Sequence, residues 1–260
     1  MKKIFLIGIF ILTGFLFLMS STAPVYAFEV GARAYIWFPN FKGDMKVDGA
    51  TLAGSYINGR EDLGLGFETY PSVEIYGGLR KHHLSLMYTS MDHSGRQTLT
   101  RNIYFNGTTY AKDTVLNTDL KVKMLDLEYQ YDLLNMENIL AGFSLGLIGK
   151  IKYFDNETKL SAQAIALNSS ETISAPIPMI GVGVHCGLLA NILEARAKVT
   201  GAGYNANNMI YEAMADLSLT PFPFMDIHGG YKIIKVKVDR KNDLIDTEFS
   251  GPYLGLTIGF

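Results

Sequence analysis

The 260-residue sequence contains a single cysteine, Cys186, so no disulfide can form within the chain. Small secreted modules held together by disulfides are therefore excluded, and stability has to come from packing, hydrogen-bond closure or lipid. The 23 basic residues do not outnumber the 25 acidic ones, which leaves no electrostatic footprint for nucleic acid. Nucleic acid is therefore not an expected partner.

Metal-binding and cofactor-binding patterns are also missing. The five histidines are scattered, there is no second cysteine, and no glycine-rich loop opens a helix. The sequence therefore predicts neither a metal nor a cofactor. Helical periodicity longer than two turns is absent as well, which argues against an α-helical fold.

Long apolar runs are confined to the N-terminus. Two lysines precede the run from Ile4 to Met19, and small residues follow at Ala23 and Ala27. This is the pattern of a secretory signal peptide, predicted over 1–27, with the mature domain over 28–260. A retained anchor is the alternative, but the run is short for a helical span of about 20 residues. No later stretch is long enough to span a bilayer as a helix.

What is present instead is period-2 alternation bounded by turn residues, typical of β-strands. No internal repeat and no linker divides the mature chain. We expect ten strands, at 28–38, 70–79, 83–91, 120–132, 139–153, 177–187, 194–201, 209–220, 226–238 and 249–260.

The connections between these strands alternate in length. Short links such as 80–82 and 221–225 separate long ones such as 39–69, 92–119 and 154–176. This alternation is typical of a transmembrane, antiparallel up-and-down β-barrel, which has tight turns at one end and long loops at the other. Eight or twelve strands are alternatives, because a further hairpin could lie within 39–69.

Charged residues share one face of most strands, while small or apolar residues take the other. A closed barrel in lipid accommodates both faces, apolar outside and polar inside, with no unpaired edge. Trp37, Phe38 and Tyr153 near the long loops are candidates for an aromatic girdle. The predicted lumen holds a charge network of Arg33, Glu74, Asp126, Glu128, Lys150, Lys152, Glu194, Arg196, Lys198, Glu212, Asp216 and Lys232.

The C-terminal strand shows the alternation most clearly, with Leu254, Leu256, Ile258 and the final Phe260 on one face. This ending resembles the C-terminal signature of Gram-negative outer-membrane β-barrel proteins. The resemblance implies that the strand is recognised by the barrel-assembly machinery. It also implies residence in the bacterial outer membrane, in contact with outer-membrane lipid and lipopolysaccharide.

Several functions remain open at this point. Because charges out of bulk water must pair, we expect a salt-bridged lumen and a non-enzymatic, structural or surface-interaction role. A narrow porin-like channel for small solutes is the alternative. A periplasmic lipocalin-like carrier would instead need an apolar interior and a polar exterior.

Two short patterns raise the question of catalysis. His83-Leu84-Ser85 has the His-x-Ser spacing of outer-membrane lipid A 3-O-deacylases, with Glu74 as a conceivable orienting acid. Asp92-His93 is an acid–histidine pair of the kind that an omptin-like protease requires at its rim. Both are more simply read as ordinary lumen or loop residues, so no catalytic residue is predicted.

Overall fold

A computed structural model describes residues 28–49, 53–136, 142–162, 167–189, 192–205, 208–239 and 243–259. The predicted signal peptide, 1–27, and the terminal Phe260 lie outside these residues. Within them, no helix is both long and apolar enough to cross a membrane.

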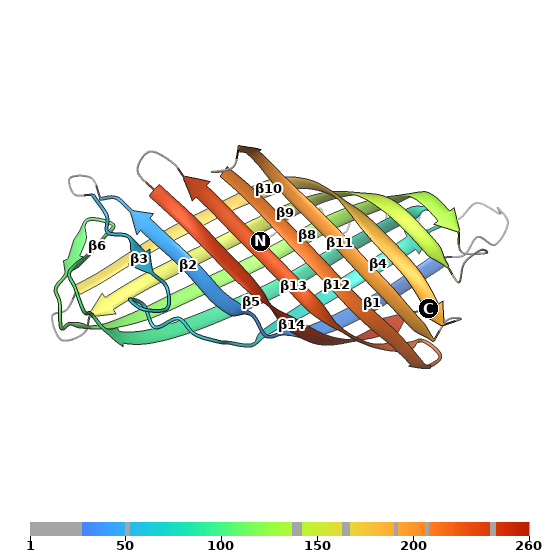
Figure 1. Ribbon diagram of the computed structural model, residues 1–260, viewed down its shortest axis with the longest axis horizontal. Coiled ribbons are helices and arrows are strands. Elements are labelled where there is room, and N and C mark those ends of the chain that lie inside the picture. Colours follow the sequence, from blue (N-terminus) through green and yellow to red (C-terminus); the bar gives the residue numbers. More distant parts are fainter. Residues whose placement is uncertain are drawn as a thin grey trace, which may run out of the picture.

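The fold is a closed antiparallel barrel of ten tilted strands in up-and-down order (Figure 1), as the sequence predicts. Neighbours along the chain are neighbours in the barrel, and β14 pairs with β1 to close it, from Gly31 opposite Gly259 to Trp37 opposite Tyr253. The barrel strands are β1 (Phe28–Trp37), β4 (Tyr70–Leu79), β5 (His82–Thr98), β8 (Val115–Met136), β9 (Phe143–Ala162), β10 (Leu167–Leu189), β11 (Leu193–Asn205), β12 (Asn208–Phe222), β13 (Met225–Asp239) and β14 (Asp243–Gly259).

Four shorter strands gather at one end of the barrel, which we call the loop end; the end with the tight turns is the turn end (Figure 1). They are β2 (Asn40–Val47), β3 (Ile57–Asn58), β6 (Ile103–Phe105) and β7 (Thr108–Tyr110). Strand β2 continues the line of β1 and pairs with the first half of β14, so it adds length and no further spanning strand. The twelve-stranded and eight-stranded alternatives are therefore wrong.

The outer wall of the barrel is apolar. Leu254, Leu256 and Ile258 of β14 are 58%, 51% and 56% exposed, and Ile75 of β4 is 61% exposed. Water would make such a continuous apolar surface costly, whereas lipid matches it. The interior carries the charged side chains, so the arrangement is the reverse of the lipocalin-like alternative.

The strands extend further toward the loop end than the sequence predicts. Long connections were expected at 92–119 and 154–176, yet β5, β8, β9 and β10 continue through much of both. On β5 the outward residues change from Leu84, Leu86 and Tyr88 to Asp92 and Ser94, so the strand leaves the apolar band near Tyr88. Beyond that level both faces meet water or loops, and the alternation that identifies a strand disappears.

A folded cap covers the loop end. We define the outer cap as residues 53–66 and 99–114, and seven of its apolar side chains are fully buried. Leu63 lies against β5, where a Cβ on Gly95 would meet its carbonyl oxygen at 2.0 Å. Arg101 ties the two halves together by donating to the Tyr56 carbonyl and to Asp62. The buried apolar residues of the cap are Ile57, Leu63, Leu65, Leu99, Ile103, Phe105 and Tyr110.

The aromatic girdle expected near the long loops is wrong for Trp37. This side chain faces the interior and is 1% exposed, with its indole N–H donating to the Gly251 carbonyl at 3.2 Å. It follows Arg33 and Tyr35 in period-2 register on β1, so strand parity directs it inward. Tyr153, by contrast, is 42% exposed on the outer wall.

Candidate functional site

The middle of the barrel is filled by paired charges. We define the central charge cluster as Asp126, Glu128, Lys150, Lys152, Glu212 and Lys232. The register of β8 with β9 sets Asp126 opposite Lys152 and Glu128 opposite Lys150, all four pointing inward. Lys152 Nζ lies 2.6 and 2.5 Å from the two Asp126 carboxylate oxygens, and Lys150 Nζ lies 3.2 Å from Glu128.

Glu212 extends this cluster across the lumen. Its strand, β12, is separated from β9 by β10 and β11, so the two can meet only through the interior. The carboxylate lies 2.9 Å from Lys150 Nζ and 2.8 Å from Lys152 Nζ, and 3.8 Å from Lys232 Nζ. Lys150 and Lys152 side chains are 1% and 0% exposed. The cluster therefore bridges the cross-section of the barrel and leaves these ammonium groups without access to solvent.

Toward the loop end the cluster borders an apolar layer. Lys232 Nζ lies 5.3 Å from the centroid of the Trp37 ring, a cation–π distance. The Trp37 ring packs edge-on to Tyr70, whose hydroxyl forms a hydrogen bond with His93 Nδ1. Trp37 and Tyr70 belong to the same apolar core as the outer cap. The interior is thus filled continuously from the cluster to the cap.

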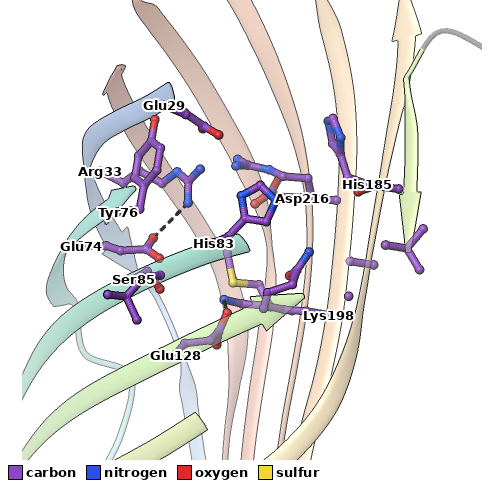
Figure 2. A pocket seen from close by; sticks show the side chains of 18 of the residues that line it. Glu29, Arg33, Glu74, Tyr76, His83, Ser85, Glu128, His185, Lys198 and Asp216 are labelled. Atoms are coloured by element: carbon purple, nitrogen blue, oxygen red, sulfur yellow. Dashed lines mark hydrogen bonds and ion pairs between the residues drawn. The ribbon is translucent and has the colours of Figure 1, made fainter. Parts of the chain in front are cut away.

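Toward the turn end the interior opens into a cavity of about 400 Å³, which we call the vestibule. Three ion pairs line its inner part. Figure 2 labels the residues of two of them, Arg33–Glu74 at 3.4 Å and Lys198–Glu128 at 2.8 Å; the third is Arg196–Asp216 at 3.0 Å. In each pair the carboxylate is the more deeply buried partner. Glu74 and Asp216 also accept hydrogen bonds from buried tyrosines, Tyr35 at 2.6 Å and Tyr253 at 2.8 Å.

Histidines and carboxylates surround the entrance of the vestibule. His83 Nε2 lies 3.1 Å from Asp132, and His185 Nε2 lies 3.2 Å from Glu194. Glu29, at the start of β1, is exposed and has no ion-pair partner within the described part of the chain. Among the described residues, no group of three or more His, Cys, Asp or Glu is placed to hold a metal.

The conceivable catalytic arrangement around His83 is not formed as expected. His83 and Ser85 both line the vestibule, away from the lipid-facing wall. The acid at His83 is Asp132, whereas Glu74 is engaged by Arg33 and Tyr35. Within the described residues no hydrogen bond joins His83 to Ser85. The β1–β4 register places Glu74 opposite Arg33, so this carboxylate belongs to the lumen charge network and does not orient His83.

The two residues of the other short pattern, Asp92 and His93, point to opposite sides of the strand. Asp92 points outward and is exposed, while His93 is buried against Tyr70 and Phe41. Adjacent residues on a strand face opposite sides, so the two side chains do not converge on one site.

The twelve residues predicted for the lumen network fall into two groups. Arg33, Glu74, Arg196, Asp216, Lys198 and Glu194 line the vestibule, and the others form the central charge cluster, with Glu128 shared between the two. Tyr35, Tyr253 and Trp37 complete the interior. The sequence singled out neither tyrosine, and it placed Trp37 in the aromatic girdle. Period-2 parity was the signal available for them, because they alternate with Ala34, Ile36 and Leu254.

Comparisons with known proteins find similarity in the fold and none in the sequence. No protein-family model matches the sequence, and no curated protein does. Among solved structures, the outer-membrane protease OmpT of Escherichia coli matches with a TM-score of 0.57 at 12% identity, covering 88% of this chain and 97% of OmpT.

Two further solved structures match with lower TM-scores. Ail of Yersinia pestis, solved with the heparin analogue sucrose octasulfate, gives a TM-score of 0.38 at 11% identity, covering 89% of this chain and 99% of Ail. Neisserial surface protein A gives a TM-score of 0.33 at 12% identity, covering 90% of this chain and 97% of that protein. At these identities the similarity concerns the fold alone. The chain has the β-barrel fold of Gram-negative outer-membrane proteins.

Proposed function

We propose that this barrel is an integral, non-enzymatic protein of the Gram-negative outer membrane whose lumen is sealed and whose work is done at its loop end, in a structural or surface-interaction role. The loop end faces the outside and the turn end faces the periplasm. The apolar outer wall supports the membrane location, and the N-terminal signal-peptide pattern supports export.

One observation carries the sealed lumen: the contact of Glu212 with Lys150 and Lys152 across the interior. A conducting pore would need a continuous water-filled path, with charges of one sign at a constriction. Here the acids and bases pair with each other instead. Water reaching the vestibule from the turn end meets this cluster and, behind it, the apolar layer under the outer cap.

The outer cap supports a role in surface interaction. Its core is closed, yet Tyr56 is 64% exposed, and Phe67, which directly follows the cap, is 62% exposed. In this proposal these two exposed aromatic side chains are the candidate contact residues at the loop end. The remaining proposed partners are outer-membrane lipid and lipopolysaccharide around the wall. The barrel-assembly machinery would act on the last strand through Leu254, Leu256, Ile258 and Phe260.

Site-directed thiol labelling tests the orientation and the seal together. In a Cys186→Ser background, single cysteines replace Thr109 on the exposed face of β7, Ser85 in the vestibule, and Thr118, which is 1% exposed beneath the cap. A membrane-impermeant maleimide is added to intact cells and then to cells with opened outer membranes.

We expect position 109 to react in intact cells, position 85 only once the periplasm is accessible, and position 118 in neither case. Reaction at position 85 in intact cells would show a path through the barrel and overturn the seal. Failure of position 109 to react in intact cells, with reaction after opening, would reverse the orientation.

A further inference from the structure

The vestibule has an ordered charge distribution that the sealed lumen does not explain. Six Asp or Glu side chains and three Arg or Lys side chains line it. Glu194, Arg196 and Lys198 follow one another on the inward face of β11, so the charge changes from acidic to basic going inward from the turn end. On β1 the order is the same, with Glu29 nearer the turn end than Arg33.

Two guanidinium groups line the cavity from different sides of the barrel. Arg33 comes from β1 and Arg196 from β11, and both act electrostatically on Glu194, Tyr35 and Tyr76. Each uses only part of its hydrogen-bonding capacity: Arg33 contacts Glu74 through Nη1, and Arg196 contacts Asp216 through Nε. Arg33 Nε is buried without a hydrogen-bond partner. A planar guanidinium with unused N–H donors is suited to a carboxylate.

Negative charge lies at the entrance. Glu29 is exposed and has no ion-pair partner among the described residues, although it acts electrostatically on Arg33, and Glu194 forms an ion pair with His185. Along a strand, residues two apart are separated by about 7 Å, which places the acidic level of Glu194 that far from the basic level of Arg196. The termini of an extended dipeptide are separated by a similar distance, about 7 Å.

We propose that the vestibule binds a small zwitterion of the dipeptide type, with its carboxylate between Arg33 and Arg196 and its ammonium group at Glu29 and Glu194. The excess of six carboxylates over three cations disfavours binding of a simple anion. The two guanidinium groups disfavour binding of a simple cation deeper in the vestibule. A ligand that carries both charges can pair with the acidic residues at the entrance and with the arginines further in. The volume of about 400 Å³ accommodates a molecule of this size.

Titration calorimetry of the refolded protein tests this proposal, with L-alanyl-L-alanine as the probe. The detergent is an uncharged maltoside, because a phosphocholine headgroup is itself zwitterionic. N-acetyl-alanyl-alanine lacks the ammonium group and alanyl-alanine amide lacks the carboxylate. We expect saturable binding of the dipeptide, and binding weaker by about tenfold or more for each capped form, because each loses a charge-assisted interaction.

Matched variants locate the site. Glu29→Gln should weaken dipeptide binding several-fold and leave N-acetyl-alanyl-alanine unchanged, while Glu61→Gln, an exposed carboxylate in the outer cap, changes neither. Arg196→Lys retains the charge beside Asp216 but removes the additional donors, so it should weaken the dipeptide and spare the amide. Heat-modifiable migration on gels establishes that each variant is folded. No saturable heat from folded protein, equal binding of the capped forms, or an unaffected Glu29→Gln variant would each overturn the proposal.

Discussion

Lys152 on β9 donates to both carboxylate oxygens of Asp126 on the adjacent strand β8, at 2.6 and 2.5 Å, with its ammonium group fully excluded from solvent. The same ammonium lies 2.8 Å from Glu212 of β12, which reaches it through the lumen. Removing one member of such a buried arrangement leaves uncompensated charge behind, and that is the basis of the first prediction.

Lys152→Met should lower the free energy of unfolding by about 3–5 kcal/mol, because Asp126 and Glu212 then share too little positive charge. Lys159→Met is the matched control: Lys159 is 49% exposed and pairs with Glu157 at 2.9 Å, so its loss should cost less than about 1 kcal/mol. Urea unfolding of vesicle-reconstituted protein measures both. Equal shifts for the two variants would contradict the buried cluster.

The single tryptophan provides a probe of the interior. Trp37 is 1% exposed and faces the lumen, so its emission should be blue-shifted and poorly quenched both by aqueous iodide and by brominated lipid. A Trp37→Phe, Ile36→Trp double variant moves the indole to a neighbouring outward position that is 52% exposed on the lipid-facing wall. Brominated lipid should quench that variant strongly. Strong quenching of the wild type by brominated lipid would show that Trp37 faces the lipid, and would contradict its position in the lumen.

The outer cap can pack closely against β5 because residue 95 is a glycine and has no side chain. A Cβ there would lie 2.0 Å from the Leu63 carbonyl oxygen, so Gly95→Val must push the cap away from β5. Gly66→Ala is the control, since no atom lies within 4 Å of its added Cβ. We expect iodide to quench Trp37 more in the first variant and no more in the second. Conductance should stay absent in both, because the central charge cluster is intact.

Acid should loosen the loop end through His93. Burial lowers the pKa of His93, which lies beyond the apolar band on β5, although the Glu68 carboxylate acts in the opposite direction. The folded state therefore binds this proton less readily than the unfolded state, whose histidine pKa is about 6.5. The stability from neutral His93 is complete above about pH 6.5 and is lost as the pH falls below it.

His93→Gln should reduce the difference in apparent melting temperature between pH 7.5 and pH 5 relative to the wild type. His82→Gln, at an exposed position on the same strand, should leave that difference unchanged. An undiminished acid sensitivity in His93→Gln would show that other groups are responsible.

The alternation of Leu254, Leu256 and Ile258 was enough to predict strand faces and, with the loop lengths, the barrel. The loop-end extensions were missed because a segment such as 155–159 is polar on both faces once it leaves the lipid. The cap was also missed, since Leu63 and Ile103 meet only through tertiary packing and follow no local period.

In the candidate site, too, the sequence predicts the strand faces but not the contacts between strands. Parity groups Arg33 with Tyr35 and Trp37 on one strand face. Pairing Arg33 with Glu74 requires the register of β1 with β4, and bringing Lys150 to Glu212 requires closure of the barrel around both. No local pattern contains either relationship, so the vestibule and the central charge cluster emerge only in three dimensions.

The sealed lumen is tested most directly by the conductance of refolded protein in a planar bilayer, with insertion verified by heat-modifiable migration of the same preparation. The account predicts a silent bilayer for the wild type and for Arg196→Ala, because Arg196 lies in the vestibule and outside the seal. Steady, salt-dependent openings of the wild type, with ion selectivity altered in Arg196→Ala, would contradict it and make the lumen charges the filter of a pore.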